Sequence, residues 1–325
     1  MRAVVLTAPG RIAVTGDRPE PECGPDEVIV RVQGVGLCGS DLSVVAGRRA
    51  VPHLPWVLGH EACGVVQTVG AAVTDRRAGQ QVVIEPNYPC FDCPACRSGA
   101  TAGCPNRRIV GISEPGVLAE LVAVPAAFAW PTPALPVEDL VCVEPFSVAC
   151  NAVELADVRP GQRCLVLGAG SQGQLVCLAV RQAGGIAHVI EPHAGRRALA
   201  EELGALPDGG GSYPVVLETS GAPSAFELAV ERAASGGTVI VVGQSTAPAK
   251  VATFPIVQRR LTIRGCLIYD HPGGFARTLA ALDSADVRPG RVLRARYSLD
   301  DAPRAFAESA DIAGKTWISI EERSA

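Results

Sequence analysis

The sequence predicts an α/β chain of two domains, a mainly β domain followed by a doubly wound parallel sheet. In the first third, short segments of alternating apolar residues lie between glycines and prolines, at 26–36, 65–70, 81–84 and 118–124. This pattern is typical of β-strands. After Pro145, apolar strands alternate with helical stretches, which favours a parallel sheet covered by helices. A length of 325 residues is enough for two hydrophobic cores.

We place the first domain at residues 1–148 and the second at residues 149–286. The strands expected in the second domain are 163–167, 187–190, 215–217 and 238–242. The last part of the chain predicts a helix at 302–313 and a strand at 317–320 that has no place in the parallel sheet. We therefore expect residues 287–325 to return to the first domain and complete it.

Charge and hydropathy narrow the class of protein. The formal net charge is −4 and no run of five basic residues occurs, so a nucleic-acid partner is not expected. The N-terminal segment reaches Pro9 before an apolar signal core could form, and no apolar run is long enough to cross a bilayer. We expect a cytoplasmic protein that acts on a small molecule and has no membrane partner.

Four of the twelve cysteines lie in one short loop: Cys90, Cys93, Cys96 and Cys104. Their spacing, C-x2-C-x2-C-x7-C, allows four thiolates to converge tetrahedrally on one zinc ion. Because four thiolates leave no open coordination position, we expect this zinc to hold the loop and to do no chemistry. An iron–sulfur cluster, which uses similar ligands, and four unrelated buried thiols are the alternatives.

A second group of candidate ligands is spread along the chain. Cys38 and His60 each lie beside a glycine at the end of an expected strand, where a side chain can point into a cleft. A thiolate and an imidazole together suit zinc. A lone cysteine or histidine is more often a packed core residue, but Glu61 and Glu144 add further candidate ligands. The combination predicts a zinc site with an open position.

The strand expected at 163–167 runs directly into a glycine-rich turn and a helix that ends near Gly184. Glycines in this context allow a tight turn and bring a pyrophosphate close to the helix N-terminus. The turn residues expected at the cofactor are Gly168, Gly170, Ser171, Gln172 and Gly173. Glu191 ends the next strand, where a carboxylate holds the ribose hydroxyls of NAD and repels the 2′-phosphate of NADP. Arg196 lies at the start of the next helix. Because an arginine there accommodates the 2′-phosphate in some proteins, NADP is the alternative cofactor.

On these motifs the chain resembles the medium-chain, zinc-dependent alcohol and polyol dehydrogenase family over essentially its whole length. They occur in the family's order: Cys38-Gly39-Ser40-Asp41, Gly59-His60-Glu61, the four-cysteine loop, Glu144-Pro145 and Val166-Leu167-Gly168-Ala169-Gly170. The resemblance implies a GroES-like first domain and a Rossmann second domain. It also implies that Cys38, His60 and Glu144 bind the catalytic zinc, as in the sorbitol and threonine dehydrogenase branch, with Glu61 ligating directly or exchanging with Glu144.

Further roles follow from the same resemblance. Asp41 matches the carboxylate that orients His60 and raises its basicity, and Ser40 matches the group that takes the alcohol proton and passes it to the cofactor ribose. Many members then use a histidine where this chain has Ser43, so the last relay step is left to His53 or to water. Gly221, Val242 and Gly243, at the ends of later strands, border the nicotinamide.

The predicted function is hydride transfer between a secondary alcohol and NAD through a zinc-bound alkoxide, in a dimer or tetramer of this chain. Cys38 to Ser43, with Glu144, Pro145 and Asn151, is similar to dehydrogenases of polyols, cyclitols and aminocyclitols. The alternatives are a ketone reductase that uses NADPH, a regulatory or structural protein with the same fold, and a nucleic-acid-binding zinc module. No zinc ligand is replaced, which disfavours the regulatory alternative, and the acidic balance disfavours the zinc module.

Overall fold

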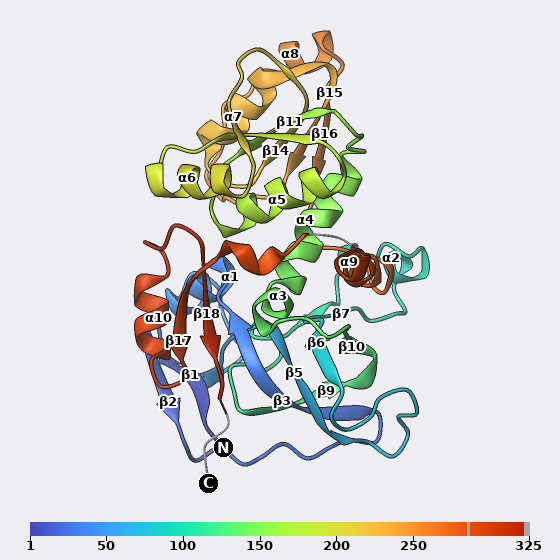
Figure 1. Ribbon diagram of the computed structural model, residues 1–325, viewed down its shortest axis with the longest axis vertical. Helices are drawn as coiled ribbons and strands as arrows, with labels where there is room; N and C mark the ends of the chain where they lie inside the picture. Colours follow the sequence, from blue (N-terminus) through green and yellow to red (C-terminus); the bar gives the residue numbers. More distant parts are fainter. Residues whose placement is uncertain (285–286, 322–325) are drawn as a thin grey trace. The chain divides into compact units, whose positions relative to one another are not determined.

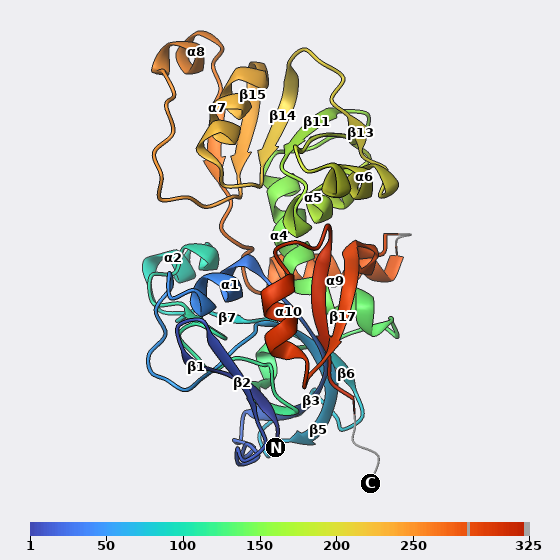
Figure 2. The same cartoon turned by 90° about the vertical axis from the view of Figure 1, so that its left-hand side faces the viewer.

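The computed structural model describes residues 1–284 and 287–321 and folds into two compact units (Figures 1 and 2). Unit 1 comprises Met1–Glu144 and Leu293–Ala325, and unit 2 comprises Pro145–Val292. The predicted fold class is confirmed, because a mainly β unit is combined with a unit built on a parallel sheet covered by helices.

Unit 1 contains a seven-stranded sheet in the order β10-β6-β5-β3-β18-β17, with β9 also paired to β3, a three-stranded sheet in the order β2-β1-β4, and the pair β7-β8. Its strands are β1 (Ala3–Ala8), β2 (Arg11–Thr15), β3 (Glu27–Gly36), β4 (Trp56–Val57), β5 (Glu61–Val69), β6 (Gln81–Ile84), β7 (Asn87–Tyr88), β8 (Arg108–Ile109), β9 (Leu121–Pro125), β10 (Ala129–Pro131), β17 (Leu293–Ser298) and β18 (Lys315–Ser319). Its helices are α1 (Gly39–Val45), α2 (Pro94–Arg97), α3 (Val137–Val141) and α10 (Ala302–Glu308), with short 3-10 turns at Thr101–Gly103 and Ala126–Phe128.

The last strand of the chain belongs to the sheet of unit 1. Strand β18 pairs antiparallel with β3, with Trp317 opposite Gly36, and Ile318 lies fully buried in the same core as Val30 and Val66. The helix expected at 302–313 is wrong at its end, because α10 stops at Glu308. The Ser309 hydroxyl donates to a backbone carbonyl of the helix, which is how short polar side chains compete with continued helix.

Unit 2 is a parallel six-stranded sheet in the order β13-β12-β11-β14-β15-β16. Its strands are β11 (Arg163–Leu167), β12 (Ile186–Ile190), β13 (Leu206–Pro207), β14 (Tyr213–Glu218), β15 (Ala233–Val241) and β16 (Thr262–Gly265). Its helices are α4 (Val143–Leu155), which begins just before the unit, α5 (Ser171–Gln182), α6 (Ala194–Glu202), α7 (Pro223–Arg232), α8 (Thr253–Gln258), α9 (Gly273–Ser284) and a 3-10 turn at Pro289–Val292. Helices α5 and α6 pack against β12, and α7 packs against β14 and β15.

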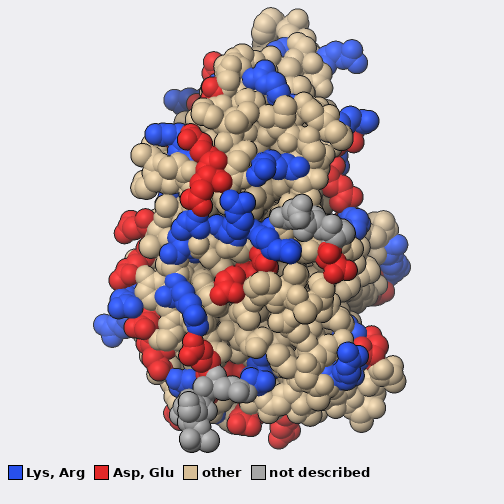
Figure 3. Space-filling model, viewed as in Figure 1, with Lys and Arg blue, Asp and Glu red and all other residues tan. Residues whose placement is uncertain are grey.

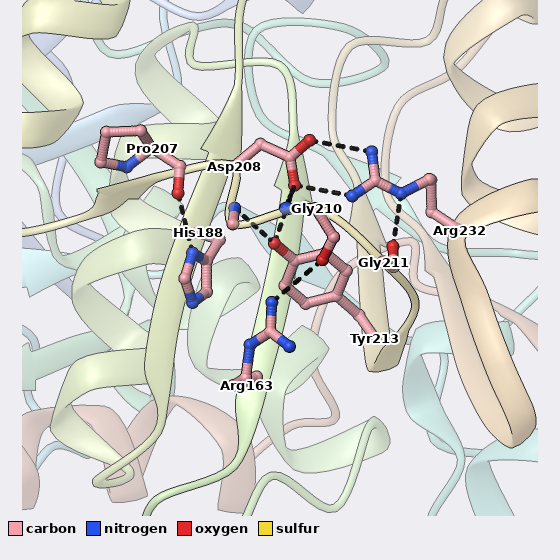
Figure 4. A network of polar contacts seen from close by, with 9 residues as sticks. Arg163, His188, Pro207, Asp208, Gly210, Gly211, Tyr213 and Arg232 are labelled. Atoms are coloured by element: carbon pink, nitrogen blue, oxygen red, sulfur yellow. Dashed lines mark hydrogen bonds and ion pairs between the residues drawn. The ribbon is translucent and has the colours of Figure 1, made fainter.

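The loop between β13 and β14 is held by a polar network at the amino edge of the sheet (Figure 4). The Asp208 carboxylate accepts hydrogen bonds from both terminal nitrogens of Arg232, at 2.9 and 2.6 Å, and from the Tyr213 hydroxyl at 2.8 Å. The guanidinium of Arg163 lies 4.5 Å from the centroid of the Tyr213 ring. Hydrogen bonding to Arg232 holds the pKa of Asp208 well below its usual range.

On the face shown in Figure 3, several basic side chains lie next to one another, and acidic groups are scattered among uncharged residues. Within the described residues, no helix has both the length and the apolar character required to span a bilayer.

Candidate functional site

The pairing of β3 with β5 brings three candidate metal ligands together in unit 1. Cys38 lies in the turn between the end of β3 and the start of α1. His60 directly precedes β5, and Glu61, its first residue, pairs with Gly36 at the end of β3. One ligand atom from each of Cys38, His60 and Glu61 lies within 4.8 Å of the others. His60 and Glu61 are buried and Cys38 is half-buried.

A buried carboxylate sets the orientation of the histidine. The Asp41 Oδ1 atom is 3.0 Å from His60 Nδ1, and its Oδ2 atom accepts a 3.0 Å hydrogen bond from the Cys38 backbone. Because Asp41 engages Nδ1, Nε2 is left for a metal. Burial lowers the pKa of His60, but the Asp41 carboxylate and the Cys38 sulfur raise it more, so that the pKa lies well above its usual range. Protonation and metal binding therefore compete at this imidazole.

The two serines of α1 have different surroundings. Ser40 Oγ lies 3.4 Å from His60 Nε2, on the side of the ring left for a metal. The Ser43 hydroxyl donates to the Gly39 carbonyl within the helix at 3.0 Å. His53 is exposed and its ring packs edge-on against Trp56, with centroids 5.0 Å apart. Ser40 thus contacts a candidate ligand, whereas the Ser43 hydroxyl bonds to its own helix and the His53 ring packs on Trp56.

Glu144 lies outside the three-residue group. It is a buried residue in the first turn of α4. Of the two glutamates expected near the zinc, the structure places Glu61 with Cys38 and His60.

Lys315 is a residue of this site that the sequence interpretation missed. Its Nζ atom lies 2.5 Å from Glu61 Oε2, and the two side chains are 2% and 1% exposed. Burial lowers the pKa of Lys315. The charge of Glu61 and other nearby groups raise it by a larger amount, so the pKa lies above its usual value. Its position at the far end of the chain carries no local signal of contact with residue 61.

The four cysteines of the loop also form a compact group, with sulfur atoms within 4.8 Å of one another. The Cys90 and Cys104 sulfurs are 3.5 Å apart. Backbone N–H groups of Cys96 and Cys90 point at the sulfurs of Cys93 and Cys104, respectively, at 3.5 and 3.4 Å. Hydrogen bonds from the backbone of Asp92 and Cys93 lower the pKa of Cys90 to about 6, whereas burial raises the pKa of Cys96 to about 12. The compact group of sulfurs with backbone donors beside them suits thiolates that hold a metal.

In unit 2, the glycine-rich turn follows β11 and opens α5, whose N-cap is Gly170. A Cβ on Gly173 would overlap the carbonyl oxygen of Gly168, so only glycine allows the helix to approach the turn this closely. Ser171 and Gln172 begin the helix, and the Gln172 amide donates to the Pro145 carbonyl at 3.2 Å.

Glu191 follows β12 and faces this turn. Its Oε2 atom accepts a 2.6 Å hydrogen bond from the Ala169 backbone, and its Oε1 atom accepts one of 2.9 Å from the His193 backbone. Arg196 lies in the first turn of α6, and its backbone N–H donates to the His193 ring at 3.3 Å. The Glu191 carboxylate is thus built into the turn.

The remaining predicted cofactor residues lie at the carboxyl edge of the same parallel sheet. Gly221 follows β14, and Val242 and Gly243 follow β15. The sequence interpretation missed Glu218, a 1% exposed carboxylate that accepts hydrogen bonds from the backbones of Ser220 and Gly221, at 2.7 and 2.9 Å. The carboxyl edge of a parallel sheet is where α/β proteins bind dinucleotides.

Known proteins match this chain in both units. The model for the alcohol dehydrogenase GroES-like domain matches residues 24–134, and that for zinc-binding dehydrogenases matches residues 169–284. The chain is 31% identical to L-galactonate-5-dehydrogenase from Escherichia coli, over 75% of this chain and 76% of the relative. It is 34% identical to L-threonine 3-dehydrogenase from Pyrococcus horikoshii, over 82% of each chain. A zinc-binding dehydrogenase structure from Sinorhizobium meliloti, bound to NADP, superposes with a TM-score of 0.91 at 30% identity over 98% of each chain.

Proposed function

The chain belongs to the zinc-binding, medium-chain alcohol dehydrogenase family, and from that premise we propose that it oxidises a secondary alcohol of the polyol class with NAD. It is a zinc-dependent, nicotinamide-linked dehydrogenase. The observation that carries the site assignment is the convergence of Cys38, His60 and Glu61, whose ligand atoms lie within 4.8 Å of one another. A thiolate, an imidazole and a carboxylate are a donor set that zinc accepts.

The bound metal would supply Lewis-acid chemistry that makes the alcohol easier to deprotonate, and the nicotinamide would accept hydride. The residues of this chain would do the rest. Asp41 holds the His60 ring through Nδ1, and Ser40 Oγ, beside His60 Nε2, takes the alcohol proton. The four-cysteine loop would hold a structural zinc through Cys90, Cys93, Cys96 and Cys104, whose sulfur atoms lie within 4.8 Å of one another.

The substrate class rests on the relatives. The names L-galactonate-5-dehydrogenase and L-threonine 3-dehydrogenase both place the oxidised hydroxyl on a secondary carbon. The test is an NAD-reduction assay with zinc-loaded protein on polyols, sugar acids, cyclitols, aminocyclitols, threonine and primary alcohols. We expect the highest kcat/KM on a secondary alcohol. No turnover on any of them, in either direction or with either nicotinamide cofactor, would favour a regulatory protein with a dehydrogenase fold.

Cofactor choice depends on Glu191. Its carboxylate would accept hydrogen bonds from the ribose hydroxyls of NAD and repel the 2′-phosphate of NADP. We expect wild-type protein to prefer NAD, and Glu191→Ala to reduce that preference by roughly tenfold or more, the effect of losing about 1.4 kcal/mol of discrimination. The measurement is kcat/KM with NAD and NADP on one alcohol. Wild-type preference for NADP would instead support an NADPH-linked ketone reductase.

We also propose that the protein is a cytoplasmic homo-oligomer. Strand β16 is an edge strand of the unit 2 sheet, and Phe254 and Val257 of helix α8 are 72% and 68% exposed. Unpaired edges and exposed apolar groups are typical of association surfaces. None of the twelve cysteines, all of which lie in the described part of the chain, forms a disulfide, which suits a reducing compartment. Sedimentation analysis of zinc-loaded protein should show a dimer or tetramer, and a monomer at micromolar concentration would contradict the proposal.

A further inference from the structure

A buried lysine from the C-terminal strand contacts the carboxylate of the catalytic metal group. Lys315 begins β18, which pairs with β3. Its Nζ atom lies 2.5 Å from Glu61 Oε2 and donates a 3.0 Å hydrogen bond to the Leu37 carbonyl. Both charged side chains are nearly inaccessible to solvent. Removing two charges from water costs free energy unless each charge is compensated. The groups around this buried ion pair must therefore compensate it.

The two oxygens of Glu61 have different surroundings. Both oxygens are buried and, among the described residues, neither makes a hydrogen bond. Oε2 lies 2.5 Å from the ammonium of Lys315 in an ion pair, and no such contact is found for Oε1 within the described residues. Oε1 belongs to a carboxylate that already lies within ligand distance of Cys38 and His60. A buried carboxylate oxygen without a partner is destabilising, and a metal ion in this group would satisfy it.

The surrounding backbone is shaped to fit the pair. A Cβ on Gly36 would overlap Glu61 Oε2 and the Cε atom of Lys315. Gly36 ends β3 and is the register partner of both Glu61 on one side and Trp317 on the other. Glycine at this position therefore allows the carboxylate and the ammonium to meet directly above the strand.

The Lys315–Glu61 ion pair changes the net charge of the metal-ligand group. Zinc carries two positive charges, which a Cys38 thiolate and a Glu61 carboxylate together cancel. An ion that is fully neutralised by its ligands has less ability to stabilise a negative charge on a substrate oxygen. The ammonium of Lys315 restores one positive charge at close range and draws electron density from Glu61.

We propose that Lys315 is a positioning residue that restrains Glu61 as a zinc ligand. It holds Oε2 so that only Oε1 is available to the metal, and it weakens that bond so that a substrate oxygen can replace the carboxylate. The proposal rests on the assignment of Cys38, His60 and Glu61 to the catalytic zinc. Without Lys315, Glu61 binds the metal more tightly, and the alcohol competes for the position less well.

The experiment uses full-length protein with zinc in the four-cysteine loop and Co²⁺ as the probe of the catalytic group. In Lys315→Met we expect Co²⁺ affinity, from chelator competition, to rise by roughly tenfold, in the range of effects of residues that contact metal ligands. Its visible absorption should weaken, because a tightly held carboxylate increases the coordination number. For the preferred alcohol, kcat should fall by roughly tenfold or more. Damage to the fold would lower the Co²⁺ affinity instead. The direction of the change therefore distinguishes loss of the Lys315 contact from damage to the fold.

Three further variants complete the test. Lys315→Arg keeps the charge and should retain the wild-type spectrum more closely than Lys315→Met. In a Glu61→Gln background, Lys315→Met should no longer change Co²⁺ affinity, because the carboxylate it restrains is absent. Lys250→Met, at the exposed lysine of unit 2, should change nothing. Unchanged or lower affinity in Lys315→Met, or the same rise without the Glu61 carboxylate, overturns the proposal. If wild-type protein binds no Co²⁺ at this group, the proposed function itself fails.

Discussion

The two metal-ligand groups of unit 1 are built in different ways. The cysteine loop draws its four ligands from one stretch, Cys90 to Cys104, and backbone N–H groups of the same stretch point at the sulfurs. The group of Cys38, His60 and Glu61 is assembled where β3 meets β5, and its lysine comes from a strand 278 residues away from Leu37. The cysteine loop is thus a local structure, whereas the group of Cys38, His60 and Glu61 depends on the pairing of strands that are far apart in the sequence.

The supporting side chains differ as well. The loop surrounds its metal position with sulfur alone, so it leaves no position for a substrate. The second group has one thiolate, one imidazole and one carboxylate, and two buried charged residues, Asp41 and Lys315, contact its members. Four equivalent ligands suit a structural ion, whereas a mixed set with buried charged neighbours allows the charge and openness of a site to be adjusted.

The largest effect expected is the contrast between matched cysteine substitutions in the two groups. Cys38→Ser should abolish turnover and leave the thermal unfolding midpoint nearly unchanged, because we assign Cys38 as a ligand of the catalytic ion. Cys93→Ser should lower the midpoint, because the closed zinc site stabilises its loop. Metal analysis should show about two zinc ions per chain in wild type and about one in each variant. Normal turnover in Cys38→Ser would remove the distinction between the groups.

The next effect concerns proton transfer at the mixed site, which is the group of Cys38, His60 and Glu61. Ser40→Ala should lower kcat by roughly 10²- to 10⁴-fold, the usual loss when a group that accepts or donates a proton is removed. The KM for NAD should change little. Ser43→Ala is the matched control, since that hydroxyl bonds to the Gly39 carbonyl within the helix. Equal effects of the two substitutions would show that Ser40 has no special role in proton transfer.

A smaller effect is expected from the carboxylate behind the histidine. Asp41→Asn keeps the size of the side chain but replaces the charged acceptor at His60 Nδ1. Metal affinity at the mixed site should fall by about 10- to 100-fold. Retention of zinc in the cysteine loop, measured on the same sample, serves as the internal control. Loss of both ions together would mean that Asp41 supports the fold of unit 1 and not one site.

The smallest effect compares the stability that a metal gives a loop with the stability that hydrogen bonds and an ion pair give one. The β13–β14 loop in unit 2 is held by Asp208 and Arg232, and partly exposed pairs contribute only about 1 kcal/mol after solvent screening. Arg232→Ala should therefore lower the unfolding midpoint by about 2–4 °C at neutral pH, less than Cys93→Ser.

The effect of Arg232→Ala should also depend on pH. Because the folded pKa of Asp208 is depressed, the stabilisation is present above its unfolded pKa of about 3.9 and is lost as the pH falls through the lower folded value. The difference between wild type and Arg232→Ala should thus shrink in acid. A difference that grows below pH 4, or a larger effect than that of Cys93→Ser, would contradict the ranking of the two loops.

Motifs with short-range geometry could be predicted from the sequence. The cysteine spacing predicted a compact thiolate group, and the strand, glycine turn and helix around Gly168 predicted the start of α5. In both cases the residues that must meet are close in sequence, so local backbone geometry decides their contact. The end of α10 was less predictable, because the competing hydrogen bond of Ser309 depends on the turn that it forms.

The mixed site shows where sequence reasoning stops. Glu61 and Glu144 were both reasonable ligands, but the register of β3 with β5 places Glu61 in the group with Cys38 and His60. Ser43 occupies the position of a relay group, yet its hydroxyl is engaged by the helix backbone. Which of two similar side chains reaches a site depends on strand pairing and on hydrogen bonds that no single segment specifies.

The sequence by itself determined the fold class, the family, the cysteine loop and the dinucleotide turn, because periodicity and fixed spacing carry that information within short segments. Only the tertiary structure decided that Glu61 joins Cys38 and His60, and that Lys315 at the start of β18 meets Glu61. The physical reason is that these contacts join residues far apart in the chain, and their geometry follows from the antiparallel pairing of β18, β3 and β5.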